Sequence, residues 1–139
     1  MDMFAIIIGT HGRLSEELLS SVDMIFGEMQ NTAAVTFLPG EGAADIAAKY
    51  EAALDKLDTS GGVLFLIDIF GGTPYNAACR IVINNERYGI VTGANLPMLV
   101  DLANTQMMDE GSDIRTLMEK AEGVGQKGVR LFHMSMVNN

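Results

Sequence analysis

Cysteine, basic residues and long apolar runs are all scarce in this sequence. A single cysteine, Cys79, excludes an internal disulfide framework and favours a reducing compartment. No apolar run approaches the roughly 20 residues that a membrane-spanning helix needs. The N-terminus also lacks the basic segment and the long apolar core of a secretory signal. These absences predict a cytoplasmic protein that does not insert into a membrane.

The charge balance argues against a nucleic-acid partner. The 139 residues include 9 Lys and Arg against 18 Asp and Glu, which gives a net charge of −9. Nucleic-acid binding depends on clustered basic side chains that neutralise phosphates, and the basic residues here are scattered. An acidic surface would steer a basic protein partner toward the molecule, although it can also serve solubility alone.

The apolar pattern predicts a single α/β domain. At 48% hydrophobic residues, the chain suits one folded core. Short apolar runs predict strands near residues 4–11, 33–38, 63–68, 87–92 and 129–134. Helical spacing predicts helices near residues 14–27, 43–57, 73–83 and 95–108, and a last helix that is capped by Ser112 with Asp113 and ends near residues 123–128. This alternation favours an open, mostly parallel, doubly wound sheet with helices on both faces. The short last strand is expected at the sheet edge, either of this subunit or of a neighbouring one.

Chemically capable residues follow the first and third predicted strands. His11 ends the first strand, and Asp68 ends the third. Ligands of open α/β sheets gather at the carboxyl ends of the strands. If these two strands are neighbours, Asp68 can fix the imidazole tautomer of His11 and leave one ring nitrogen as a nucleophile.

The segment after Asp68 has the composition of an anion site. Gly71 and Gly72 allow close approach of backbone N–H groups, while Thr73 and Pro74 predict an N-cap and a first helical residue. A helix that starts there points its positive end toward His11. Together these features predict a site for a phosphoryl group, with His11 as its acceptor.

Each of these residues also has a purely structural interpretation. A lone histidine at a strand end is more often a hydrogen-bonded structural residue, and Asp68 can simply cap a turn. The Gly-Gly-Thr-Pro segment at residues 71–74 is a common strand-to-helix joint. The joint occurrence at one edge of one sheet is what favours a functional site.

The remaining candidates are interpreted as structural. His133 lies in an alternating tail, Cys79 lies in the apolar part of a predicted helix, and the ten methionines suit core or interface positions. No His, Cys and carboxylate cluster has zinc spacing. No P-loop or G-x-G-x-x-G follows the first strand. We expect no metal and no cofactor.

Several dispersed motifs then resemble one known family. They are Ile-Gly-Thr-His-Gly at 8–12, Phe-Leu-Pro-Gly-Glu at 37–41, Gly-Val-Leu-Phe-Leu-Ile-Asp at 62–68, Phe-Gly-Gly-Thr-Pro-Tyr-Asn-Ala-Ala at 70–78 and Asn-Leu-Pro-Met-Leu-Val at 95–100. The sequence resembles the enzyme IIA component (EIIA) of the mannose family of the bacterial phosphoenolpyruvate-dependent sugar phosphotransferase system (PTS). The resemblance covers essentially the whole chain and implies one EIIA domain over residues 1–139.

The resemblance implies a phosphocarrier in sugar transport. In that family the carrier HPr phosphorylates the histidine at the position of His11, and the phosphoryl group then passes to enzyme IIB. The family aspartate that orients the imidazole matches Asp68. The hydroxyl residue after the glycine pair, often serine, is Thr73 here, which adds a methyl group. Arg13 follows the histidine motif and has two interpretations, a phosphoryl or partner contact and a solvated side chain.

The resemblance also implies a homodimer in which C-terminal strands are exchanged, so residues 129–134 match the exchanged strand. The sequence ends at Asn139 without the Ala/Pro-rich linker that leads into a IIB domain in some relatives, so a free-standing IIA protein is expected. The transported sugar is left open, because the membrane components and IIB determine it.

Three other interpretations were compared with this one. A non-catalytic regulatory domain on the same fold is the first alternative, and only a transfer assay separates it from a carrier. A histidine phosphatase expects Arg directly before its histidine, where Thr10 stands, and a second catalytic histidine, for which only His133 remains. A receiver domain expects paired acids after the first strand, where Thr10 and His11 stand.

Overall fold

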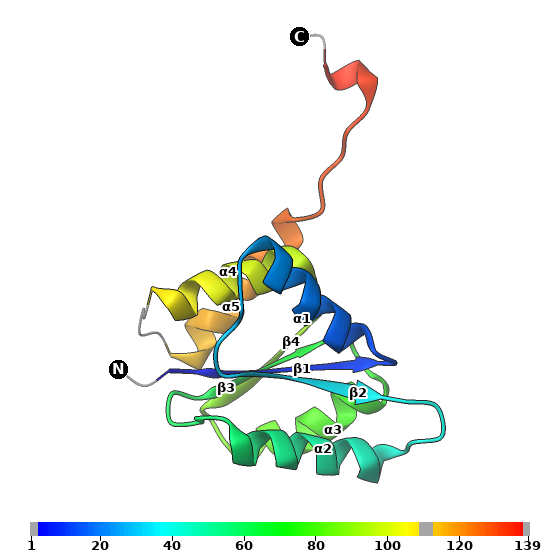
Figure 1. Cartoon of the computed structure of the whole chain (residues 1–139), viewed down its shortest axis with the longest axis vertical. Coiled ribbons are helices and arrows are strands. Elements are labelled where there is room, and N and C mark those ends of the chain that lie inside the picture. The colour runs from blue at the N-terminus through cyan, green and yellow to red at the C-terminus, as the bar shows by residue number, and fades with distance from the viewer. Residues whose placement is uncertain (1–2, 109–112, 138–139) are drawn as a thin grey trace.

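The computed structural model describes residues 3–108 and 113–137. Strands and helices alternate along the chain until two helices follow one another near its end (Figure 1). The elements are β1 (Ala5–His11), α1 (Leu14–Ile25), β2 (Thr32–Phe37), α2 (Ala43–Lys56), β3 (Val63–Ile67), α3 (Gly72–Val82), β4 (Tyr88–Thr92), α4 (Leu96–Met107), α5 (Ile114–Lys127) and the 3₁₀ helix η1 (Met134–Met136).

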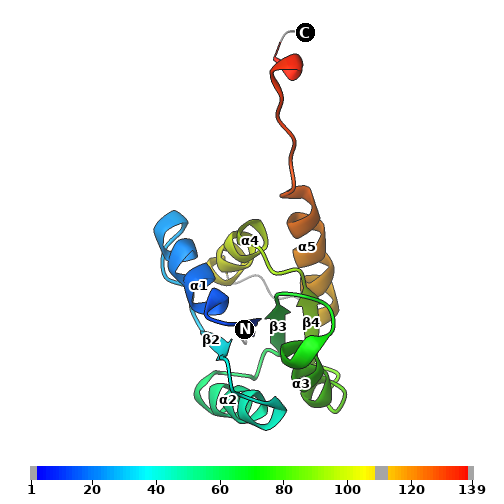
Figure 2. The ribbon, with the colours of Figure 1, turned by 90° about the vertical axis from the view of Figure 1, so that its right-hand side faces the viewer.

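The four strands form one parallel sheet in the order β2-β1-β3-β4. Helices α1, α4 and α5 cover one face, and α2 and α3 cover the other (Figure 2). The predicted open, doubly wound α/β sheet is therefore confirmed. Its central pair, β1 and β3, is the pair whose ends carry His11 and Asp68.

Burial on both faces explains why the central strands are continuously apolar. Along β1, Ile6 and Ile8 belong to the core beneath α1, α4 and α5, whereas Ile7 belongs to the core beneath α2 and α3. All three side chains are fully buried. A strand between two helical layers has no solvent face, so its sequence shows no polar alternation.

The predicted N-cap of α3 was wrong. The cap residue is Gly71, and the helix begins at Gly72, so Thr73 lies inside the first turn. Gly71 and Gly72 have φ values of 80° and 79°, in the left-handed region that glycine adopts most readily. The two glycines therefore take the cap and first helical positions that were predicted for Thr73 and Pro74. At α5 the expected cap Asp113 accepts from the Thr116 N–H, while Ser112 lies outside the described residues.

The C-terminal segment departs from the predicted strand. After α5 the chain extends away from the domain in both views, and residues 129–133 form neither helix nor strand (Figures 1 and 2). A strand requires a hydrogen-bonded neighbour, and within the described part of this single chain the segment has none. Its apolar side chains are exposed, among them Leu131 at 84% and Phe132 at 81%.

The length and apolar character of the helices bear on membrane insertion. Over residues 3–108 and 113–137, no helix combines the length and the apolar character that crossing a membrane requires.

Candidate phosphoryl-transfer site

Parallel pairing of β1 with β3 brings His11 and Asp68 together. Gly9 of β1 is in register with Ile67 of β3. His11 and Asp68 come shortly after these two residues, so both lie at the carboxyl end of the central strand pair. The Nδ1 atom of His11 lies 3.0 Å from Oδ2 of Asp68. The sequence predicted this contact between His11 and Asp68 if the first and third strands were neighbours. They are neighbours, and the contact is present.

Backbone donors hold the Asp68 carboxylate in place. Its Oδ2 also accepts from the His11 backbone N–H, and its Oδ1 accepts from the Ile69 N–H, each at 3.0 Å. A carboxylate can only accept, so the proton in the ring contact belongs to Nδ1 of His11. The lone pair of the imidazole is then on Nε2. The His11 side chain is 46% exposed and that of Asp68 only 12%, which leaves the imidazole accessible and its partner covered.

The start of α3 lies against the free side of the imidazole. A Cβ placed on Gly72 would lie 3.4 Å from Cε1 and 3.6 Å from Nε2 of His11. The first N–H groups of a helix have no intrahelical acceptor, and the helix dipole makes this end positive. Gly71, Gly72 and the half-buried Thr73 thus place a potential anion site beside the His11 ring.

Phe37, the last residue of β2, forms another wall of the site. Its ring meets the His11 ring edge to face, with centroids 5.8 Å apart and planes at 79°. Its carbonyl accepts from the Gly12 N–H at 2.8 Å. Phe37 was not predicted to border the site, although it lies in the Phe-Leu-Pro-Gly-Glu motif.

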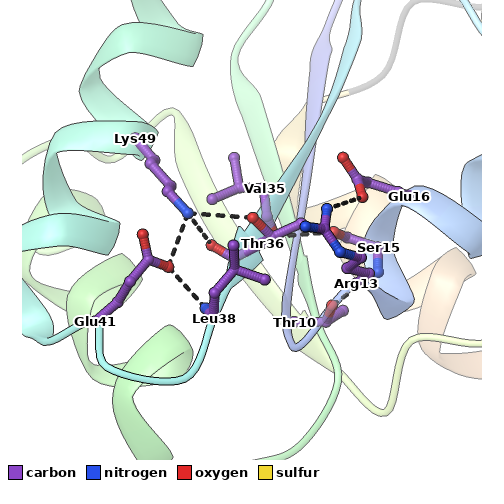
Figure 3. A network of polar contacts seen from close by, with 9 residues as sticks. All are labelled: Thr10, Arg13, Ser15, Glu16, Val35, Thr36, Leu38, Glu41 and Lys49. Atoms are coloured by element: carbon purple, nitrogen blue, oxygen red, sulfur yellow. Dashed lines mark hydrogen bonds and ion pairs between the residues drawn. The ribbon is translucent and has the colours of Figure 1, made fainter.

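The ion pair between Lys49 and Glu41 fixes the chain at Thr36 and Leu38 (Figure 3), the two residues that flank Phe37 in the sequence. Lys49 of α2 donates to the carbonyl of Thr36 at 2.9 Å and to Oε1 of Glu41 at 2.8 Å. The same Glu41 oxygen accepts from the Leu38 N–H at 2.7 Å. The Lys49 hydrogen bond and the backbone donor hold the pKa of Glu41 below its usual value. Side chains 8 positions apart thereby stabilise the loop that follows β2.

Two buried hydroxyls shape the turn after β1. Thr10 is fully buried, and its Oγ1 accepts from the Ser15 N–H at 2.7 Å. The Ser15 hydroxyl donates to the Val35 carbonyl at 2.8 Å (Figure 3). These bonds tie the start of α1 to β1 and β2. The role of Thr10 could have been suspected from the sequence, because Thr10 is a polar residue within an otherwise apolar strand.

The other candidates lie outside this constellation. Arg13 forms an ion pair with Glu16 at 3.2 Å and is 66% exposed, which agrees with a solvated first-turn side chain. His133 is exposed in the C-terminal segment, where its Nδ1 accepts from the Ser135 N–H. Cys79 is half-buried in α3. Among the described residues, no group of three or more His, Cys, Asp or Glu side chains is arranged to hold a metal ion.

A family model described as "PTS system fructose IIA component" (EIIA-man) matches residues 5–121. The chain belongs to the mannose-type EIIA family of the PTS. This confirms the resemblance drawn from the motifs. EIIA components take part in phosphoryl transfer during sugar uptake, so the expected function is confirmed at the level of the family.

Individual EIIA relatives agree with this assignment. The "PTS system mannose-specific EIIAB component" of Escherichia coli K12 is 44% identical over 126 residues, which cover 91% of the chain and 38% of that protein. The "PTS system fructose-specific EIIA component" of Bacillus subtilis is 36% identical, with 93% and 86% covered. A solved "Mannose/sorbose specific IIA subunit" from Enterococcus faecalis has a TM-score of 0.82 at 29% identity, covering 94% of the chain and 96% of that structure.

The chain spans only 38% of the length of the first of these EIIA relatives. The activity of that longer protein as a whole is therefore not assigned to this chain. The structural similarity covers nearly the full length of both chains, so the EIIA fold itself is shared.

Proposed function

We propose that this EIIA chain is a phosphohistidine carrier. His11 accepts a phosphoryl group from phospho-HPr and passes it to enzyme IIB for sugar uptake. The observation that carries the proposal is the contact between Nδ1 of His11 and Asp68, which leaves the Nε2 lone pair of a half-exposed side chain beside the start of α3. The transported sugar is determined by other components.

The transfer follows from this geometry. The lone pair on Nε2 of His11 forms a bond to phosphorus while the bond from phosphorus to the donor imidazole breaks, and that electron pair returns to the donor ring. The Nδ1 proton stays between His11 and Asp68, whose carboxylate stabilises the positive charge that develops on the ring. Transfer to IIB is the same step with His11 as the leaving group.

The phosphoryl oxygens need stabilisation, because charge spreads over them in a loose transition state. The N–H groups of Gly71 and Gly72 and the hydroxyl of Thr73 are the proposed donors. The start of α3 supports this role through its unpaired amides and its positive end. The donor is a phosphohistidine and not a nucleotide, so the proposed step needs no metal.

Protein partners must reach His11 from the carboxyl edge of the sheet. Exposed apolar side chains from the adjoining α1 and β3–α3 loop are available there: Leu14 at 45%, Ile69 at 55% and Phe70 at 77%. The net charge of −9 complements a basic partner. We propose that HPr and enzyme IIB dock on this apolar patch in the cytoplasm, and that residues 1–139 act as a single EIIA domain.

We further propose that the chain forms a homodimer by exchanging residues 129–134. Three features support this arrangement. The segment extends from the domain with its apolar side chains exposed. Strand β4 lies at the sheet edge, so one of its sides has no neighbouring strand in the described chain. A groove of about 600 Å³ between β4 and α5, lined in part by Ile90, Thr92 and Met118, adjoins that edge.

The carrier role is tested by intact mass after incubation with enzyme I, HPr and phosphoenolpyruvate. We expect an acid-labile gain of one phosphoryl group in the wild type, loss of that gain in His11→Ala, and retention in His133→Ala. The two histidines are the only ones in the chain, so this pair of variants is a matched control. Absence of the gain in the wild type would contradict the carrier role and favour a regulatory domain on the same fold.

A further inference from the structure

Tyr50 is a buried tyrosine directly beneath the site. It comes from α2 and is fully buried, with its ring edge to face against Phe65 of β3 at a centroid distance of 5.2 Å. Burial raises the pKa of its hydroxyl, and the Asp68 charge adds to the effect. The hydroxyl therefore stays protonated and remains a hydrogen-bond donor throughout the working range of pH.

The Tyr50 hydroxyl donates to the Pro74 carbonyl at 2.8 Å. Pro74 lies in the first turn of α3, two positions after Gly72. A carbonyl oxygen has two acceptor positions, so this bond can exist beside the one that a helix makes. The bond links α2 to the turn that carries the proposed phosphoryl donors.

The same hydroxyl is held against β1 at Gly9. A Cβ on Gly9 would overlap Oη of Tyr50, so only glycine leaves room for it there. Gly9 lies two residues before His11 on the same strand and pairs with Ile67, which precedes Asp68. The hydroxyl thus lies between the strand that carries the nucleophile and the helix turn that faces it.

We propose that Tyr50 is a positioning residue for phosphoryl transfer: its hydroxyl spans from Gly9 to Pro74 and sets how closely the Gly72 turn approaches Nε2 of His11. The proposal rests on the proposed function of the site. Gly72 is already close to the ring, since a Cβ there would lie 3.6 Å from Nε2. A small shift of this turn would therefore change the amide geometry around the transferred group.

The test compares Tyr50→Phe with Tyr88→Phe. Each variant loses one hydroxyl. Tyr88 of β4 packs against the same core cluster as Tyr50, but it pairs with Val63, at the opposite end of β3 from Asp68. Single-turnover transfer from phospho-HPr gives the maximal rate and KM, and ¹H–¹⁵N spectra of the unphosphorylated proteins give the Gly71 and Gly72 amide shifts. Thermal unfolding of both variants reports any general loss of stability.

We expect Tyr50→Phe to transfer roughly 10-fold to 100-fold more slowly at unchanged KM, because the docking surface is untouched while the phosphoryl donors are displaced. Its Gly71 and Gly72 amide signals should move, and those of Tyr88→Phe should not. A purely structural tyrosine would lower the melting temperature and leave rate and amide shifts as in the wild type, which would overturn the proposal.

The amide spectra also separate this proposal from the function of the site. If wild-type His11 takes no phosphoryl group, the carrier role fails while the spectra still decide the placement of the turn. Movement of the Gly72 signal in Tyr50→Phe alone would then still show that Tyr50 places the turn, and an unmoved signal would show that it does not.

Discussion

Nδ1 of His11 lies 3.0 Å from Oδ2 of Asp68, although the two residues are 57 positions apart in the chain. Two helices and one strand separate β1 from β3 in the sequence, but β1 and β3 are parallel neighbours in the sheet, which brings the two residues together. The crossover through β2 and α2 therefore creates the contact.

The first prediction concerns the acceptor of that contact. Asp68→Asn should retain the fold and slow transfer to His11 by about 100-fold or more, since an amide can favour the wrong imidazole tautomer and cannot stabilise the developing positive charge. Rapid-quench kinetics with phospho-HPr would measure the rate. Asp23→Asn, on the exposed surface of α1, is the control and should transfer normally. Unchanged kinetics in Asp68→Asn would remove the orienting role.

The second prediction uses the adjacent glycines of the α3 turn. Their φ values of 80° and 79° mean that alanine at either position costs about 1 to 2 kcal/mol in backbone strain. A Cβ on Gly71 would meet nothing within 4 Å, whereas one on Gly72 would lie 3.4 Å from Cε1 of His11. Gly71→Ala and Gly72→Ala should therefore lose similar stability in urea unfolding, but Gly72→Ala should be phosphorylated much more slowly. Equal transfer rates would show that Gly72 does not border the reacting ring.

The third prediction follows from the lowered pKa of Glu41. A carboxyl whose pKa is lower in the folded state contributes stability above its ordinary value of 4.5. That contribution is lost as the pH falls from 4.5 through the lowered value. Glu41→Gln should therefore flatten the acid side of a plot of unfolding free energy against pH, while Glu51→Gln on the exposed face of α2 should not. Parallel wild-type and Glu41→Gln curves would mean that the Lys49 pair adds no pH-dependent stability.

The sequence predicted the sheet and the His11–Asp68 contact well, because both depend on strong local signals. Continuous apolar runs mark strands buried on two faces, and polar residues just beyond them mark the functional edge. The N-cap of α3 was wrong because residue preference alone favours threonine, whereas the backbone turn requires two positive φ values that glycine adopts. The backbone conformation of this turn, rather than residue preference, therefore determines where the helix begins.

Residues such as Phe37, Lys49 and Tyr50 could not be predicted for a different reason. Each acts through a partner distant in sequence, for instance Tyr50 through Pro74, 24 positions away. Hydrophobic periodicity assigns such side chains to the core of a helix or strand without naming their contacts. Only the packing of the elements in space reveals that Phe37 meets the His11 ring, that Lys49 holds the chain beside Phe37, and that Tyr50 reaches the first turn of α3.

The last prediction addresses the C-terminal segment. Leu131 and Phe132 are exposed in the single chain, so changing both to serine should leave the stability of the domain unchanged and weaken the proposed dimer. Sedimentation equilibrium over a dilution series would measure the dissociation constant, which should rise in Leu131→Ser/Phe132→Ser.

Met24→Ser is the matched control for that experiment. Met24 is 91% exposed on α1, so the control removes an exposed apolar side chain that belongs to no proposed interface. It should dimerise as the wild type does. A double variant with the wild-type dissociation constant would show that the apolar segment is not what joins two chains. The exposed edge of β4 would then need another neighbour, because an unpaired strand edge invites pairing with a further chain.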